Sequence, residues 1–443
     1  MKIVTIGAGS IVWGPTINTD FLVNPELDGA ELVLMDINAE TLDLVQRFLE
    51  RLIRENGFKK TITATTDLEE ALRDADYVLT AISVGGDRLW RYDAIFPQVY
   101  GIFQPVGDTI GPGGMMRALR HIPALLKVGR TMQRVSKPGA KLLQLTNPMN
   151  PLCDALSQLE GFTVYGICHG YDDTEVIIAK QLGVPREQVR VELAGNNHHV
   201  YCLSLHVGET MYTPDTIAQL TPRLFDTPLR AEVFHRYGML VGNYSRHPIE
   251  FLPGFLTAEY AFGRAWGVEP IAEEIDPLLG ERQDLARARL EQALSQHEAI
   301  AWRNEGSNHG LAQTGSGLAE TGHSREIIDD FIVAMEHKRD FFMHLNVANE
   351  GAIAGVAPEY NVELPATFHK GELVRPAIRF PNETLVQEIN RVGYEQHLIA
   401  QACLTHDTDL LIEALSSDAL VPNKTIAKRL VEEMCAFERD FLS

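Results

Sequence analysis

The chain has 443 residues, of which 45% are hydrophobic and 22% are charged. At roughly 100–200 residues per domain, this length predicts two or three domains, and the composition excludes disordered, collagen-like and disulfide-scaffold proteins. The 60 Asp and Glu residues outnumber the 39 Lys and Arg residues, which gives a formal charge of −21. Because so acidic a surface repels nucleic-acid phosphates and anionic lipid headgroups, we expect neither nucleic acid nor a membrane as partner.

The apolar runs of the chain are short. A bilayer-spanning helix needs roughly 20 apolar residues, and no run approaches that length. The N-terminus enters a strand-like run without the cationic start of a signal peptide. Five cysteines without a C-x-x-C pair indicate reduced thiols rather than a disulfide framework. These features predict a cytoplasmic protein.

The N-terminal part alternates between strand-like and helix-like segments. A β-branched run predicts a strand over 2–6, which is followed by Gly7-Ala8-Gly9-Ser10 and a helix to about residue 22. The alternation continues with strands and amphipathic helices at 31–35, 39–55, 62–65, 67–74, 77–81, 141–145 and 163–167. Such alternation is typical of a parallel, doubly wound sheet, so we predict an α/β fold with an N-terminal Rossmann-like domain.

Beyond residue 190, where we expect the sheet to end, the pattern becomes irregular. Helices are predicted near 283–303, 324–342, 383–399 and 422–442. The simplest division therefore places the Rossmann-like domain at residues 1–190 and a C-terminal, α-rich mixed α+β domain at residues 191–443.

The glycine-rich turn after the first strand is the first candidate site. Gly7 and Gly9 can bring backbone N–H groups close to a pyrophosphate, because glycine has no Cβ to block the approach. The third glycine of the dinucleotide fingerprint is absent from its usual place, and a plain tight turn is the alternative. Asp36, however, ends the second strand, where a carboxylate can accept the ribose hydroxyls of NAD and repels the extra phosphate of NADP. We predict NAD binding by Gly7, Gly9, Ser10 and Asp36.

Two further segments carry candidate ligands. Cys168-His169-Gly170 ends a predicted strand, and a second segment reads Gly195-Asn196-Asn197-His198-His199. Thiolate and imidazole both bind transition metals, although the spacing matches no zinc pattern. A buried thiol and ordinary polar histidines are the alternative explanation.

The run from Gly107 to Arg120 is a third candidate segment. Its glycines form a rigid loop before a basic helix, which suits binding of a polar ligand, and a loop whose glycines serve only its turns is the alternative.

Together these segments resemble glycoside hydrolase family 4, whose members depend on NAD. The resemblance covers nearly the whole chain. It rests on Gly7–Ser10, Gly85-Gly86 with Arg88, Arg91 and Asp93, the 107–114 loop with 117–120, Thr146-Asn147-Pro148-Met149-Asn150, Cys168–Gly170, 194–198 and 346–365.

The resemblance implies a glycosidase with NAD+ on its first domain and with metal, substrate and subunit contacts on its second. Cys168 and His198 would hold Mn2+ or another divalent metal, and Asn147 would lie beside nicotinamide and sugar. Homodimers or homotetramers are common among relatives. The remaining substrate-binding candidates are Asn150, His169 and three arginines that could bind a carboxylate or serve surface ion pairs, namely Arg88, Arg91 and Arg246.

The family mechanism oxidises the C3 hydroxyl of the sugar by hydride transfer to NAD+, which acidifies the hydrogen at C2. A base removes that proton, the aglycone leaves C1, water adds back and the hydride returns. Relatives place a Tyr or Asp base in the segment that corresponds to 240–251, and the position of the Asp is Ser245 here. We therefore expect Tyr244 as base, with His247 second, and Asp108 as a residue that polarises a hydroxyl or leaving group. A loop residue with a merely structural hydrogen bond is the alternative for each.

The substrate is also indicated by resemblance. Cys-His-Gly resembles the branch that acts on unphosphorylated α-glycosides, and α-galacturonide or α-galactoside is favoured over α-glucoside. An NAD-dependent dehydrogenase of the lactate and malate type is the alternative enzyme, because it shares the glycine turn and Asp36. A catalytically silent nucleotide-sensing protein is the alternative from another class.

Overall fold

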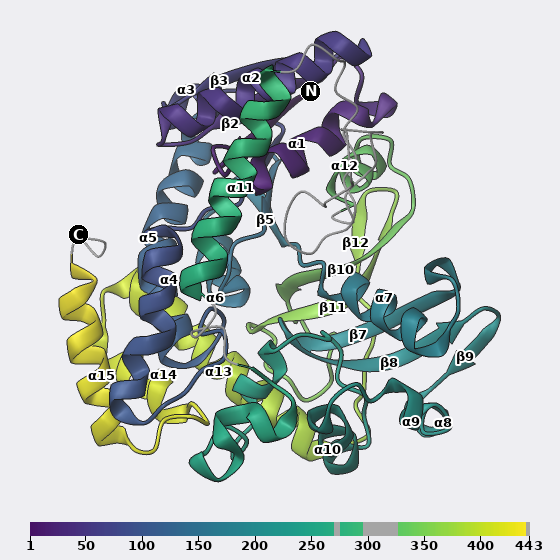
Figure 1. Ribbon diagram of the computed structural model, residues 1–443, viewed down its shortest axis with the longest axis vertical. Helices are drawn as coiled ribbons and strands as arrows, with labels where there is room; N and C mark the ends of the chain where they lie inside the picture. Colours follow the sequence, from purple (N-terminus) through teal and green to yellow (C-terminus); the bar gives the residue numbers. More distant parts are fainter. Residues whose placement is uncertain (270–274, 296–326, 440–443) are drawn as a thin grey trace.

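The computed structural model describes residues 1–269, 275–295 and 327–439. Through these residues runs one 12-stranded sheet, in the order β3-β2-β1-β4-β5-β6-β10-β11-β7-β8-β9, with β12 beside β11 (Figure 1). The predicted fold class, α/β with a Rossmann-like sheet, is confirmed.

Six parallel strands form the N-terminal half of the sheet. They are β1 (Lys2–Ile6), β2 (Glu31–Met35), β3 (Thr61–Thr65), β4 (Tyr77–Thr80), β5 (Ala140–Gln144) and β6 (Phe162–Gly166). The connecting helices are α1 (Trp13–Val23), α2 (Ala39–Asn56), α3 (Leu68–Leu72), α4 (Gly86–Ile95), α5 (Gly111–Val135) and α6 (Met149–Ser157). The order of the six parallel strands in the sheet, 3-2-1-4-5-6, is that of dinucleotide-binding sheets.

Antiparallel strands extend this sheet. They are β7 (Val189–Asn196), β8 (His199–Val207), β9 (Thr210–Tyr212), β10 (Phe341–Ala348), β11 (Asn361–His369) and β12 (Glu372–Val374). β10 joins the edge of β6, and β11 joins β7. The expectation that the sheet ends near residue 190 is therefore wrong, because the strand that extends it comes from residues far along the chain. The division into two domains stays a prediction.

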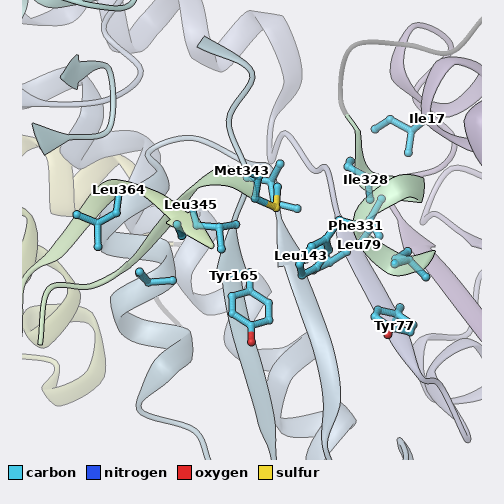
Figure 2. Packing of buried hydrophobic residues seen from close by; sticks show 14 of the residues in the cluster. Ile17, Tyr77, Leu79, Leu143, Tyr165, Ile328, Phe331, Met343, Leu345 and Leu364 are labelled. Carbon is cyan, nitrogen blue, oxygen red and sulfur yellow. The ribbon is translucent and has the colours of Figure 1, made fainter. Parts of the chain in front are cut away.

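The two halves share one hydrophobic core. Figure 2 shows Leu79 of β4, Leu143 of β5 and Tyr165 of β6 beside Met343 and Leu345 of β10, and all five side chains are buried. Central strands covered on both faces are mostly apolar, which explains why β4 and β5 were recognisable in the sequence.

The remaining helices of the described residues lie partly beside the antiparallel strands and partly against helices α2, α5 and α6 of the N-terminal half (Figure 1). They are α7 (Gly170–Leu182), α8 (Pro214–Ile217), α9 (Thr221–Leu224), α10 (Pro228–Tyr237), α11 (Ile275–Ser295), α12 (Ile328–Glu336), α13 (Glu383–Thr405), α14 (Thr408–Ser417) and α15 (Lys424–Phe437). The helices predicted near 383–399 and 422–442 correspond to α13 and α15, and 440–442 lie outside the described residues. None of the described helices is both long and apolar enough to cross a bilayer.

Two predicted helices differ from the structure. The one near 283–303 is α11, which begins earlier, at Ile275, and its predicted end lies outside the described residues. The one near 324–342 is α12, which runs only from Ile328 to Glu336, and the predicted residues 324–326 lie outside the described part. Lys338 has a φ of 51°, a left-handed conformation that ends a helix, and β10 begins at Phe341.

Candidate active site

Four predicted site segments follow the carboxyl ends of parallel strands. Gly7–Ser10 follows β1, Asp36 follows β2, Asn147 lies after β5 and Cys168 after β6. Parallel strands end at a common edge, which is where sheets of this kind bind ligands. The sheet therefore brings the predicted cofactor and metal segments to one side of the molecule.

The glycine turn is closely packed. Gly7 has a φ of 91°, and a Cβ on it would lie 2.2 Å from the Ala81 carbonyl oxygen. Gly14, in the first turn of α1, approaches the Ala8 carbonyl oxygen so closely that its Cβ would lie 2.2 Å away. Gly14 thus provides the close helix packing that the fingerprint assigns to its third glycine. The sequence analysis missed it because it lies beyond the usual spacing.

Asp36 is tied to the same turn. Its Oδ2 accepts the Gly9 N–H (2.9 Å) and its Oδ1 accepts the Asn38 N–H (2.9 Å). A Cβ at Gly9 would lie 2.7 Å from Asp36 Cγ, and Ser10 Oγ accepts the Trp13 N–H at the start of α1 (3.2 Å). Turn, helix start and carboxylate therefore form a cradle that a side chain at Gly9 would fill, and these features fit a dinucleotide.

A second cluster gathers Asp108, His198 and His247, whose ligand atoms all lie within 4.8 Å of one another. Asp108 precedes α5, His198 lies in the turn between β7 and β8, and His247 begins the 3-10 helix η4 (His247–Phe251). Asp108 Oδ1 is 3.3 Å from His247 Nε2, and the two imidazole centroids are 4.1 Å apart. A carboxylate with two imidazoles is a donor set that suits a divalent transition metal.

The protonation of His198 follows from a chain of hydrogen bonds. Thr109 Oγ1 donates its one proton to Asp108 Oδ1 (2.6 Å), so at 3.0 Å it accepts the Nδ1–H of His198. Burial lowers the pKa of His198 well below its ordinary value, which keeps the ring neutral. Nε2 of His198 therefore carries the lone pair, as a metal-binding imidazole requires. Thr109 was not among the predicted site residues.

His247 is held from both sides. Ser245 Oγ lies 2.8 Å from His247 Nδ1, while Nε2 faces Asp108. Burial alone would lower the pKa of His247, but the Asp108 carboxylate outweighs it and raises this pKa. Burial would likewise raise the pKa of Asp108, and the charge and hydrogen bond of His247, with the charge of Arg117, hold it below its ordinary range instead. Asp108 and His247 thus form a pair that can hold a proton between them, oriented by Ser245.

The loop that carries Asp108 is fixed by two buried side chains that the sequence analysis missed. Glu250 accepts the N–H groups of Val106 (2.5 Å) and Gly107 (3.0 Å). Gln104 donates to the Ile110 carbonyl oxygen (2.7 Å) and accepts the Gly113 N–H (2.8 Å). Burial raises the pKa of Glu250 to about 7. A carboxylate inside the apolar run 248–252 was the available signal.

Asn147 belongs to the cluster. Its side-chain Nδ2 donates to Asp108 Oδ2 (3.1 Å), and its backbone carbonyl oxygen accepts from Arg117 Nε (3.0 Å). Asn150 is buried one turn later, where its Nδ2 donates to Gln396 Oε1 (3.0 Å). Arg117 entered the sequence analysis only through the family resemblance, and its charge lowers the pKa of Asp108.

Cys168 and His169 are not members of this three-residue cluster. Cys168 is half-buried, and its Sγ is 3.6 Å from the place of a Cβ on Gly170. His169 precedes α7, with its ring 6.3 Å from that of Trp13 in the cofactor turn.

Three predicted residues lie elsewhere. The Tyr244 hydroxyl donates to the Leu224 carbonyl oxygen (3.0 Å), and the Arg230 guanidinium lies 3.8 Å from its ring centroid. Tyr244 therefore packs in the core near α9, and burial raises the pKa of its hydroxyl. Arg88 and Arg91 are exposed on α4, whereas Arg246 is half-buried beside His247.

The chain matches known proteins over most of its length. The model described as "Family 4 glycosyl hydrolase" matches residues 2–184, and that of the "Family 4 glycosyl hydrolase C-terminal domain" matches residues 193–421. An alpha-galactosidase of Rhizobium meliloti is 29% identical over 425 residues, which cover 95% of this chain and 84% of that protein. An alpha-galacturonidase of Thermoanaerobacterium saccharolyticum is 27% identical over 486 residues, which cover 100% and 96%.

A solved structure has the same fold. It is that of a 6-phospho-beta glucosidase from Thermotoga maritima, determined with manganese, NAD+ and glucose-6-phosphate. The TM-score is 0.76 at 22% identity, and the match covers 100% of this chain and 99% of that one. The two family models together settle the classification: this chain is a glycosidase that belongs to glycosyl hydrolase family 4.

Proposed function

We propose that the protein hydrolyses unphosphorylated α-glycosides, α-galactosides or α-galacturonides foremost and α-glucosides as a further candidate, with NAD+ and Mn2+ as cofactors. The observation that carries this proposal is the Asp108–Thr109–His198 chain, which leaves Nε2 of His198 available beside His247. The alpha-galactosidase and alpha-galacturonidase relatives support the substrate class.

The cradle at Gly7, Gly9, Ser10 and Asp36 fits NAD+, which supplies a hydride acceptor when bound. We expect Asp36 to accept ribose hydroxyls and Asn147, which donates to Asp108, to bind beside the nicotinamide and the sugar. Ile37, an apolar residue that is 91% exposed, follows Asp36 and offers a surface for a base ring.

The donor set near Asp108 fits a divalent metal. We propose Cys168 and His198 as its ligands, and a bound Mn2+ would supply a Lewis acid that polarises a sugar oxygen. Thr109 fixes the tautomer of His198. The Asp108–His247 pair takes up and returns the proton at C2, with Ser245 orienting the imidazole. Asn147, Asn150 and His169 bind the sugar, and Arg246 or Arg117 would face the carboxylate of a uronide.

The dehydrogenase alternative accounts for the cradle and leaves the His198 chain without a role. By family resemblance we also propose a cytoplasmic homodimer or homotetramer, which light scattering after size-exclusion chromatography would test.

The test is hydrolysis of p-nitrophenyl α- and β-glycosides that cover galactose, glucose, galacturonate and glucuronate, with NAD+, Mn2+ and thiol each present or omitted. We expect cleavage of an α-galactoside or α-galacturonide that needs all three and forms no net NADH. Cleavage that is independent of NAD+ would refute the mechanism. Net NADH formation from a small hydroxy acid would establish the dehydrogenase instead.

Asp36→Ala is expected to weaken NAD+ binding about 10- to 100-fold, since hydrogen bonds to a charged group contribute about 1.5–3 kcal/mol. Isothermal titration with NAD+ measures the change. Asp43→Ala is the matched control, because Asp43 is an exposed carboxylate on α2 that pairs with Arg47. Equal affinities of the Asp36→Ala variant and the wild type would overturn the assignment of Asp36.

A further inference from the structure

A row of four paired residues crosses the sheet beside the site. Gly166 of β6 is paired with Asn346 of β10, Asn346 with Glu363 of β11, and Glu363 with Gly195 of β7. Directly paired residues present their side chains on one face, and the glycines at both ends have none. The row therefore presents Asn346 and Glu363 between the strand that leads to Cys168 and the strand that leads to the His198 turn.

Asn346 is buried at 1% exposure, and within the described residues its Oδ1 accepts no hydrogen bond, while its Nδ2 lies close to Glu363 without forming a well-aligned one. The amide faces the carboxyl of Glu363, which is 2% exposed. Burial raises the pKa of Glu363 to about 7, an effect that the facing amides of Asn197 and Asn346 partly oppose. An unsatisfied buried carbonyl oxygen costs about 1–3 kcal/mol, so the stability of the fold does not explain an asparagine here.

Two neighbouring amides also have an unpaired oxygen, and their hydrogen bonds fix their orientation. Asn197 donates its Nδ2 to Glu363 Oε2 (2.9 Å), and Asn150 donates its Nδ2 to the Asn361 carbonyl oxygen (3.1 Å). Within the described residues, Oδ1 of each has no partner. Because both amino groups meet acceptors, the unpaired atoms are carbonyl oxygens that need a donor. Asn197 immediately precedes His198.

We propose that Asn346, together with Glu363 and Asn197, forms a recognition site for sugar hydroxyls. The buried wall presents unpaired acceptors, and a polyhydroxylated ring brings several O–H donors to it. A substrate carboxylate has no O–H donor for these acceptors and would lie against the carboxyl group of Glu363. We therefore expect this wall to bind the hydroxyl-bearing side of the sugar. The inference rests on the proposed glycosidase function and names residues that bind its substrate.

The test is Asn346→Leu, which replaces the amide with an apolar group of similar size. Removing unsatisfied buried polar groups is neutral or stabilising, so we expect an unchanged or higher urea midpoint. The affinity for D-galactose or D-galacturonate, titrated with NAD+ and Mn2+ present, is expected to fall about 10-fold or more for whichever sugar the wild type binds. Asn346→Ala carries the same binding expectation and adds no bulk.

Asn349→Leu is the matched control. Asn349 is also fully buried, but its amide donates to the Val356 carbonyl oxygen (2.8 Å) and accepts the Ile353 N–H (2.7 Å). We expect its urea midpoint to fall clearly. A similar fall for Asn346→Leu would assign Asn346 to the fold and overturn the inference.

The sugar titrations separate this inference from the proposed function. Unchanged sugar affinity in both Asn346 variants would overturn the recognition site while hydrolysis by the wild type upheld the function. A wild type that binds a sugar through Asn346 but cleaves no glycoside would uphold the site and refute the function. Binding of neither sugar by the wild type would overturn the recognition site.

Discussion

His198→Ala is expected to lower kcat/KM for the cleaved glycoside about 1000-fold, because a metal ligand that polarises the substrate contributes several kcal/mol and each 1.4 kcal/mol is a factor of ten. The free Nε2 of His198 is lost, and Thr109 no longer has a partner on that side. Mn2+ binding, followed by the electron paramagnetic resonance signal of the free ion, is expected to weaken in parallel. A variant that keeps both full activity and full Mn2+ affinity would refute the assignment.

His199→Gln is the matched control for this variant. His199 is the next residue, but its Nε2 lies 2.8 Å from the Tyr201 hydroxyl and its ring stacks on Phe251 with centroids 4.9 Å apart. Burial lowers its pKa to about 3, so it is a neutral core histidine. We expect its loss to change stability and to leave Mn2+ affinity close to that of the wild type.

Cys168→Ser distinguishes two ligand sets for the same metal. If Cys168 and His198 hold the ion, the serine variant loses Mn2+ affinity about as strongly as His198→Ala does. If Asp108, His198 and His247 hold it, the serine variant retains affinity, and Asp108→Asn loses it. Cys153→Ser, which alters a buried thiol on α6, is the control for thiol replacement.

The parallel half of the sheet was predictable because each strand and its helix are local features. Strands β1 to β6 lie within one or two residues of their predicted places, since a buried strand flanked by turns is visible in a short window. The pairing of Asn346 with Gly166 joins positions far apart in the sequence. No local pattern encodes that register, so the antiparallel extension was missed.

The site was predictable only as far as motifs reach. Asp108, Asn147, His198 and His247 came from segments that resemble the family, and the structure places these four together. Tyr244 was predicted from its segment alone, which did not reveal that its hydroxyl donates to the Leu224 carbonyl oxygen. Thr109, Glu250 and Glu363 were missed because their roles depend on hydrogen bonds between elements that are distant in the chain.

Arg120→Ala is expected to lower the free energy of unfolding by about 3–5 kcal/mol, because it leaves buried carboxylates without their cation. Arg120 donates both Nη groups to the carboxylate of Asp93 (2.8 and 2.6 Å) and also pairs with Glu438, and all three side chains are fully buried. This triad joins α4 and α5 to the end of the C-terminal helix α15. Urea unfolding followed by circular dichroism at about pH 8 measures the loss.

The deficit of Arg120→Ala is expected to depend on pH. Burial raises the pKa of Asp93 to about 6 and that of Glu438 to about 7, and the positive charge of Arg120 opposes this rise. Removing Arg120 is therefore expected to raise both pKa values further. Between about pH 4 and 7 the folded variant then binds more protons than its unfolded chain, and its stability falls as the pH rises. The deficit relative to wild type should therefore be smaller at about pH 5 than at about pH 8.

Arg134→Ala is the control for a cation outside the core. Arg134 lies 3.6 Å from Glu69 in an exposed ion pair, and such pairs contribute about 0–1 kcal/mol. We expect its small deficit to be the same at both pH values. A small and pH-independent deficit for Arg120→Ala would mean that the ion pairs of the buried triad contribute nothing to the free energy of unfolding. The attachment of α15 would then depend on its apolar contacts with α14.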